Sequence, residues 1–270
     1  MDIMFELTRR CDMQCSHCLR GDAQGVDMSS HMIRTILLKL EDIASNFSFG
    51  GGEAILKPEL INQFTQELHW SGINTQWLEP MWIVSNGKRL YNIDDPYNPS
   101  ELTDALIRLS NYVPITLAIS TDKYHEDGAD SRYNHAEYLF EHTPDIQLCK
   151  HGPRDYSNLV DMGRFRGGRE VKEAVNEDDL KLFYINIHGD IFPSCDLSYN
   201  FMDEFKDTAI CFGNILTDTL EDIMTKRQKL IDICIFAEED YVYLTEDSIG
   251  DLEEWTEDYN NHINNNELCA

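Results

Sequence analysis

The feature that most constrains the fold is a repeated alternation of short apolar runs with stretches of helical periodicity over the first 150 residues. The apolar runs that suit strands are residues 3–8, 47–49, 81–84, 115–119 and 146–148. The helical stretches between them begin near Ser29 or Ser30, Pro58, Pro99 and Ser131. Strands that alternate with helices of this length form parallel βαβ units with right-handed crossovers. We therefore predict an α/β fold, a partial (β/α)6 barrel of the TIM type, over residues 1–180.

The periodicity weakens after residue 150, where glycine and arginine gather at 162–169. Residues 183–187 and 190–192 flank His188-Gly189, which predicts a β-hairpin at the start of a small α+β extension over 181–236. Between residues 237 and 270 there are 11 Asp or Glu and no Lys or Arg. This last segment is expected to be an acidic tail, either a solvated helix or a mobile one, with no chemistry of its own.

The charge balance limits the partners that the chain can bind. The sequence has 49 Asp and Glu against 22 Lys and Arg, for a formal net charge of −27. Such a surface repels phosphate backbones and anionic lipids, so we expect no nucleic acid or membrane partner and a neutral or basic substrate. A role of the acidity in solubility stays open. No apolar stretch approaches the roughly 18 residues that span a bilayer, and the first ten residues lack signal-peptide features, so a cytoplasmic location is expected.

A tight group of cysteines directly follows the first predicted strand. Cys11, Cys15 and Cys18 are three of eight cysteines, and one loop can wrap their thiolates around a single small object. In a reducing compartment such a group indicates a metal site and not a disulfide framework. Three ligands on an iron–sulfur cluster leave one iron open to an external ligand. Structural zinc is the main alternative, although no second close pair of ligands is present, and three unrelated buried thiols are a further one.

With these residues the sequence resembles the radical S-adenosylmethionine (SAM) superfamily, whose signature is three cysteines at this spacing with a ring residue before the last. His17 holds the ring position and is expected, from the resemblance, to be a cofactor-binding residue, and Asp12 stands where Asn is commoner. The resemblance implies a 4Fe-4S cluster on Cys11, Cys15 and Cys18, with SAM at the open iron.

A glycine run after the second predicted strand supports the resemblance. Glycines let a backbone approach a ligand closely and present N–H groups to it, and a carboxylate can accept from an ammonium group. Gly51, Gly52 and Glu53 match the Gly-Gly-Glu of the superfamily, which binds the amino group of SAM, while Ala54 replaces a frequent proline. An ordinary strand-to-helix turn is the alternative interpretation.

Two further motifs lie at predicted strand ends, where barrel enzymes place ligand contacts. Ser85-Asn86-Gly87 and Ser120-Thr121-Asp122 are similar to motifs of the superfamily, and the resemblance assigns Asn86 and Ser120 to the ribose or carboxylate of SAM. Turn or helix-cap roles account for both equally well. Tyr124 and His125 are candidates to face the substrate.

The resemblance thins beyond residue 150. Gly163-Arg164 and the segments 189–195, 212–215 and 220–223 are similar to the SPASM extension of peptide-modifying members. A complete SPASM cysteine set is excluded, because the remaining cysteines are Cys149, Cys195, Cys211, Cys234 and Cys269. One auxiliary cluster stays an alternative to buried structural cysteines.

The resemblance implies an oxidoreductase-type enzyme that cleaves SAM to a 5′-deoxyadenosyl radical, which takes hydrogen from a substrate. It implies no side chain in general acid or base catalysis, and an electron donor such as flavodoxin or ferredoxin. The SPASM-like extension favours a peptide or protein side chain as substrate. The alternatives are a small metabolite, activation of a glycyl-radical enzyme, and a non-catalytic iron–sulfur or zinc binding module.

Overall fold

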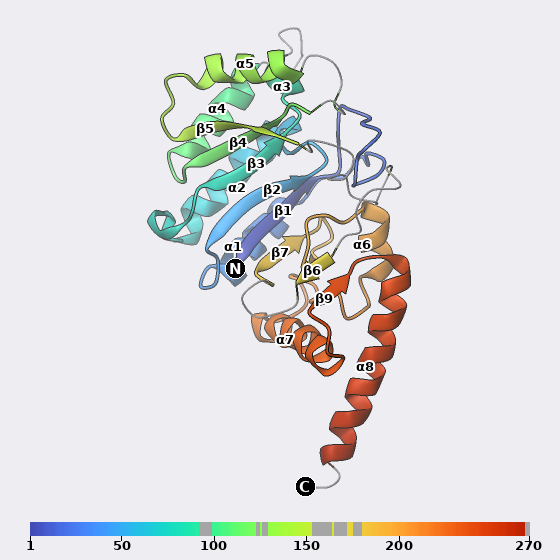
Figure 1. The fold of residues 1–270 in the computed structure, drawn as a ribbon. Coiled ribbons are helices and arrows are strands. Elements are labelled where there is room, and N and C mark those ends of the chain that lie inside the picture. Colours follow the sequence, from blue (N-terminus) through green and yellow to red (C-terminus); the bar gives the residue numbers. More distant parts are fainter. Residues whose placement is uncertain are drawn as a thin grey trace.

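The computed structural model describes residues 1–91, 99–122, 125, 129–152, 164, 172–174 and 180–267. Its main sheet has seven strands in the order β5-β4-β3-β2-β1-β7-β8 (Figure 1). These strands are β1 (Asp2–Thr8), β2 (Asn46–Gly51), β3 (Met81–Ser85), β4 (Ile115–Ser120), β5 (Ile146–His151), β7 (Leu182–Ile185) and β8 (Ile191–Phe192). All neighbouring strands pair in parallel except β7 and β8. Six parallel strands in this order confirm the predicted partial barrel.

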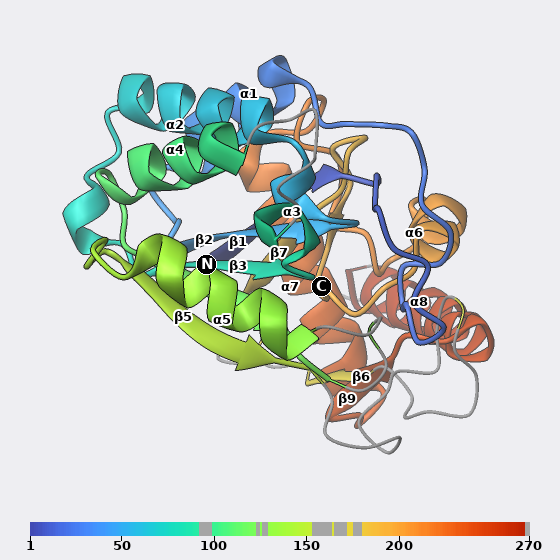
Figure 2. The ribbon, with the colours of Figure 1, turned by 90° about the horizontal axis from the view of Figure 1, so that it is seen from above.

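The helices of the barrel are α1 (Ser30–Leu40), α2 (Pro58–Ser71), α3 (Lys88–Tyr91), α4 (Pro99–Ser110) and α5 (Ala129–Phe140), with 3-10 turns η1 (Ala54–Leu56) and η2 (Thr75–Trp77). Helices α1, α2 and α4 begin where the sequence signals placed them, α5 begins two residues before the predicted Ser131, and the short α3 was not predicted. Ser29 caps α1 because its hydroxyl accepts from the N–H of Met32 at 3.1 Å. Pro58 opens α2, and Gly72 ends it in the left-handed region at φ 78°. Helices α1, α2 and α4 lie side by side along one side of the sheet (Figure 2).

The core fills the space between the sheet and these helices. Alternate β1 residues Ile3, Phe5 and Leu7 are fully buried. The ring of Phe64 on α2 meets Phe5 at 5.1 Å and Phe49 at 4.9 Å, both edge to face. The outer face of the sheet is thereby covered, and the polar residues at the carboxyl ends of the strands are left for the site.

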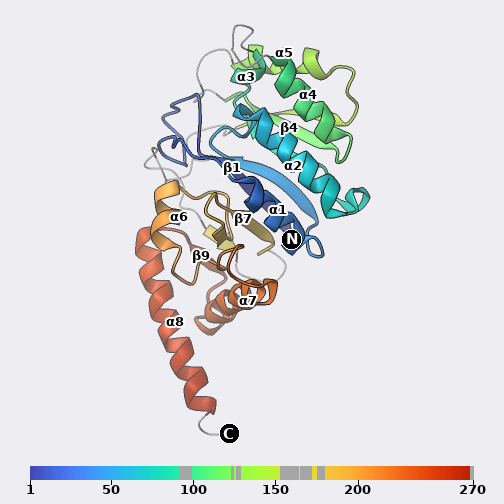
Figure 3. The same ribbon diagram turned by 180° about the vertical axis from the view of Figure 1, so that it is seen from behind.

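The extension begins in the main sheet. Strand β7 pairs with β1, and β7 and β8 form the predicted hairpin, so the hairpin lengthens the barrel sheet instead of forming one of its own. The other elements are β6 (Lys172–Ala174), α6 (Tyr199–Phe205), α7 (Leu220–Phe236), β9 (Tyr241–Tyr243) and α8 (Glu246–Glu267). Strands β6 and β9 form a separate antiparallel pair. Helix α8 projects from the body (Figures 1 and 3), so residues 246–267 of the acidic tail are helical, whereas residues 241–243 form β9 and pair with β6. Within the described residues, no helix combines the length and apolar character needed to cross a bilayer.

Candidate cofactor site

The loops that follow β1, β2, β3 and β4 meet at the carboxyl edge of the sheet and enclose a cavity of about 170 Å³. Its lining includes the residues that the motifs pointed to: Cys11, Cys15, His17, Cys18, Gly52, Glu53, Asn86, Ser120 and His125. The structure therefore brings together residues that are up to 114 positions apart, from Cys11 to His125 (125 − 11). Of the predicted cofactor residues, Gly51 lies next to the lining without being part of it.

The three cysteines are half-buried, and none of them is part of a disulfide. Burial, and then the nearby carboxylate of Glu53, raise the pKa of Cys11 to about 12. In the absence of a metal this thiol is protonated at neutral pH.

The glycine run holds the end of β2 against the loop that carries the cysteines, residues 9–28, here called the cysteine loop. The N–H of Gly52 donates to the carbonyl of Thr8 and that of Glu53 to the carbonyl of Arg10, both at 2.8 Å. A Cβ on Gly51, at φ 108°, would lie 2.3 Å from the Thr8 oxygen, and one on Gly52 would lie 2.2 Å from the Arg10 oxygen. These two N–H groups, which we expected to face a ligand, are used by the chain itself. The glycines are required for the close approach of two backbones.

Glu53 is a buried carboxylate, and one of its two oxygens has no donor in good hydrogen-bond geometry in the described part of the chain. Its side chain points into the cavity lining, and the residue is 2% exposed. Oε2 accepts from the N–H of Asn86 at 2.8 Å, while Oε1 is buried and has no hydrogen-bond donor in the described part of the chain. Burial raises the pKa of Glu53 to about 7, against the opposing effect of the Asn86 N–H. A buried acceptor without a donor is what an ammonium group of a ligand would satisfy.

The turn after β3 ties the cysteine loop to the sheet. The side-chain amide of Asn86 donates to Asp12 Oδ1 at 2.9 Å, and its oxygen accepts from the N–H of Lys88 at 2.8 Å. Lys88 Nζ donates to the carbonyl of Asp12 at 3.0 Å. Asn86 thus has the cap role that was the alternative to ligand contact. Sequence reasoning missed Lys88, whose only signal is its place directly after the Ser85-Asn86-Gly87 motif.

A second polar group borders the cavity beside Ser120, which is buried at the end of β4. The Nδ1 atom of His125 lies 2.7 Å from Asp122 Oδ2, and the rings of His17 and His125 meet edge to face at 4.7 Å. One ligand atom from each of His17, Asp122 and His125 lies within 4.8 Å of the others. His125 therefore lines the cavity, its contact with a substrate stays a prediction, and Tyr124 lies outside the described residues. The contact between His17 and His125 had no signal in the sequence.

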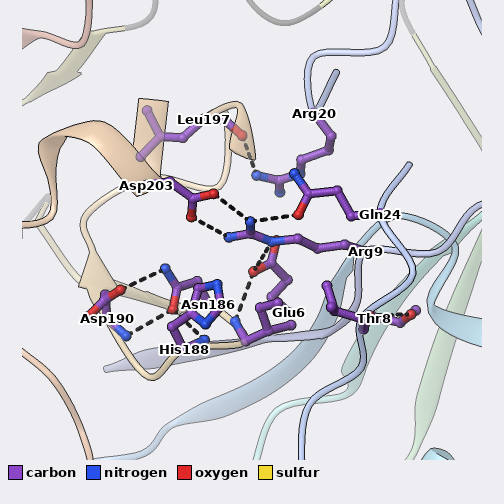
Figure 4. Close-up of polar contacts among 12 residues, drawn as sticks. Glu6, Thr8, Arg9, Arg20, Gln24, Asn186, His188, Asp190, Leu197 and Asp203 are labelled. Carbon is purple, nitrogen blue, oxygen red and sulfur yellow. Dashed lines mark hydrogen bonds and ion pairs between the residues drawn. The ribbon is translucent and has the colours of Figure 1, made fainter. Parts of the chain in front are cut away.

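Arg9, at the start of the cysteine loop, is fully buried and tied to the extension (Figure 4). Its Nη1 and Nη2 donate to the two oxygens of Asp203 on α6 at 3.0 Å each, and Nη1 also donates to Gln24 at 3.1 Å. Nε donates to Glu6 at 3.2 Å, and the guanidinium lies 4.6 Å over the ring of Tyr199. Burial raises the pKa of Glu6 against the opposite effect of Arg9. The bidentate bond to Asp203 fixes the geometry of this end of the loop.

Arg20, just past the last cysteine, is held by the same extension (Figure 4). Its Nη1 donates to the carbonyl of Leu197 at 2.6 Å, and its guanidinium lies 4.5 Å over the ring of Tyr184 on β7. Its carbonyl accepts from the N–H of Tyr199 at 3.1 Å. Residues of the extension therefore hydrogen-bond to the cysteine loop on both sides of the three cysteines, at Arg9 and at Arg20. Sequence reasoning missed both arginines, because their partners in the extension lie more than 160 residues away.

The other described cysteines do not line the cavity that Cys11, Cys15 and Cys18 border. Cys211 is 6% exposed and its Sγ donates to the carbonyl of Gly213 at 3.5 Å, while Cys234 on α7 is fully buried. Burial raises the pKa of each of these two thiols to about 11. Cys195 is half-buried, and Cys149 lies on β5. Cys269 and Gly163 lie outside the described residues. Cys211 and Cys234 have the environment of structural cysteines.

Comparison with known proteins finds likeness in solved structures. No protein-family model matches the chain, and no curated protein matches it. The structure titled "Native anSMEcpe with bound AdoMet and Cp18Cys peptide" aligns at TM-score 0.56 and 12% identity over 86% of this chain and 82% of that one. BtrN in an open conformation aligns at TM-score 0.50 and 16% identity over 86% and 84%. The chain shares the fold of these two proteins. At this identity the likeness shows the fold alone, so any activity has to be argued from the site itself.

Proposed function

We propose that this protein is a radical SAM enzyme. Cys11, Cys15 and Cys18 would hold a 4Fe-4S cluster, and the cavity beside them would hold SAM. The single observation that carries the proposal is the buried Oε1 atom of Glu53, which lacks a donor in the described part of the chain and borders the same cavity as the three thiols. A buried carboxylate oxygen without a donor destabilises a fold. Because Glu53 lies beside the three cysteines, its unpaired oxygen indicates that a cationic ligand binds there.

The chain's own residues account for the binding and orientation of the two groups. Glu53 would accept from the SAM ammonium, Ser120 would contact its ribose or carboxylate, and His17 would border its base. Gly51, Gly52 and Asn86 would act beside them, chiefly by holding the cysteine loop and Glu53 in place. When bound, the reduced cluster supplies the electron that splits SAM into methionine and a 5′-deoxyadenosyl radical, which takes a hydrogen atom from the substrate.

The proposed substrate is a peptide or protein side chain. The fold is shared with a protein whose structure title records a bound peptide, and the net charge of −27 favours a neutral or basic substrate over nucleic acid or an anionic membrane. The electron would come from a small redox protein such as flavodoxin or ferredoxin. The cytoplasm is the proposed location, because the cluster and eight cysteines suit a reducing compartment.

The test is the production of 5′-deoxyadenosine. We would reconstitute the protein anaerobically with iron and sulfide, reduce it with dithionite, add SAM and quantify the nucleoside. We expect product from the unchanged protein and from a Cys149→Ala control, and none from a variant with Ala at Cys11, Cys15 and Cys18. Glu53→Gln should retain the cluster absorbance and lose most of the product. A protein that holds a full cluster and yields no nucleoside would be a binding module and not an enzyme.

A further inference from the structure

Helix α8 carries a row of apolar residues that is buried at one end and exposed at the other. Leu252, Trp255, Tyr259 and Ile263 follow one another at intervals of three and four residues, so they share one face of the helix. Leu252 is fully buried, Trp255 and Tyr259 are half-buried, and Ile263 is 38% exposed. The last turns of α8 project past α7 (Figures 1 and 3). The row therefore continues where no described element covers it.

The end of α7 extends this row sideways. Ile235 is 65% and Phe236 is 41% exposed. The ring of Phe236 lies 5.9 Å from that of Tyr259 and 5.3 Å from that of His262. We call Ile235, Phe236, Tyr259, His262 and Ile263 the α7–α8 surface. Exposed apolar residues that cluster in this way mark interaction sites more often than scattered ones do.

Carboxylates surround the α7–α8 surface. Glu238, Glu239 and Asp240 follow α7 directly, and Glu257 and Asp258 lie on α8 beside Tyr259, all of them exposed. No Lys or Arg occurs between residues 237 and 270. An apolar patch with a rim of one sign of charge selects a partner of the opposite sign, because the rim attracts it and repels others.

We propose that the α7–α8 surface docks a basic, amphipathic segment of a partner polypeptide. Apolar side chains of the segment would cover Phe236 and Ile263, and its Lys or Arg side chains would meet the carboxylate rim. A second copy of this chain, with its own charge of −27, is disfavoured by repulsion. On the basis of the proposed function, this segment belongs to the peptide substrate and recruits it at a distance from the residue that reacts.

Defined peptides test the docking without cluster or SAM. The probe is a fluorescent Lys/Leu/Ala peptide with leucines at helical spacing, and its matched peptides carry Ser in place of Leu or Glu in place of Lys. Anisotropy titrations with the full chain should give affinity for the probe at least about tenfold above that for either matched peptide. The affinity should also weaken as the salt concentration rises from about 0.05 to about 0.3 M. Equal binding of the probe and the Ser peptide would overturn the proposal.

Paired variants locate the binding. Ile235→Ser with Ile263→Ser removes apolar contact, and Glu239→Lys with Asp240→Lys reverses the rim. Each pair should weaken probe binding at least about tenfold. The controls are Leu216→Ser, at a residue 42% exposed elsewhere, and Glu41→Lys with Asp42→Lys, which changes net charge by the same amount. They should change binding less than about twofold.

If the variants and their controls lose the same amount of affinity for the probe, the peptide is attracted to the acidic protein in general. That outcome would overturn the proposal of a docking site at the α7–α8 surface. Thermal melts of each variant verify folding. Because the probe needs neither iron nor SAM, failure of the proposed enzyme activity leaves this result readable, and failure of docking leaves the 5′-deoxyadenosine test unaffected.

Discussion

The carboxyl group of Glu53 is protonated more readily in the folded protein than in the unfolded chain, because burial raises its pKa from 4.5 to about 7. The folded state therefore binds the proton more tightly, and stability falls as pH rises from about 4.5 to about 7. Glu53→Gln keeps an oxygen for the Asn86 N–H and removes the charge. We expect this variant without cofactors to be about 1–3 kcal/mol more stable than the parent at pH 8, with a smaller difference at pH 5.

Urea unfolding at the two pH values measures this difference. Glu79→Gln, at an exposed position, is the matched control and should change stability little at either pH. A Glu53→Gln variant less stable than the parent at pH 8 would mean that the carboxylate is satisfied by the protein itself, and the argument for a cationic ligand would fail.

Two glycines of this chain should respond in opposite ways to alanine. A Cβ on Gly52 would lie 2.2 Å from the Arg10 carbonyl, so Gly52→Ala must push the cysteine loop away from β2. We expect a loss of about 2–4 kcal/mol in stability and poor iron incorporation. Gly250 in α8 has no atom within 4 Å of a Cβ, and Gly250→Ala should stabilise the protein by up to about 1 kcal/mol. Denaturant unfolding measures the stability of both variants, and iron content per chain measures cluster incorporation. Normal iron content in Gly52→Ala would contradict the role of Gly52 in packing the cysteine loop against β2.

At the scale of elements, the extension should govern how firmly the cysteine loop is held. Asp203→Asn replaces one of the two carboxylates that pair with the buried Arg9 by a neutral amide, while Glu6 remains, and the Asp203 side chain is 43% exposed. We expect a loss of about 1–3 kcal/mol in stability and faster loss of iron to a chelator. Glu204→Gln, the exposed neighbour on α6, is the control. If both variants release iron at the parent rate, the extension does not secure the loop.

The order of strands and of the longer helices in the barrel could be predicted because each strand is an apolar run and each of these helices has a local start signal, such as the Ser29 cap, whereas the four-residue α3 was not predicted. The gathering of Cys11, Glu53 and Ser120 could be predicted as well, since carboxyl ends of parallel strands share one edge. Helix α7 was missed although Thr219 and Asp222 form a reciprocal cap, because its apolar stripe is weak. The bond from Arg9 to Asp203 joins residues 194 apart and has no local signal.

At the scale of the whole molecule, the excess of negative charge should oppose the compact state. With 49 acidic against 22 basic residues, carboxylates outnumber basic side chains by more than two to one. The Debye length falls from about 30 Å at 0.01 M salt to about 10 Å at 0.1 M, so repulsion across the molecule is screened over that range. We expect the melting temperature to rise by about 2–8 °C as monovalent salt is raised to about 0.3 M.

The identity of the salt separates screening from effects of ions on water. Screening depends on ionic strength alone, so sodium chloride and sodium perchlorate should give equal rises below about 0.3 M. Salt effects on apolar burial differ between anions and grow steadily with concentration, whereas screening saturates within this range. A rise with chloride but a fall with perchlorate would show that apolar burial, and not charge repulsion, limits stability. Equal rises in melting temperature would show that repulsion among the acidic residues destabilises the folded state. A basic partner bound to the α7–α8 surface would reduce this repulsion.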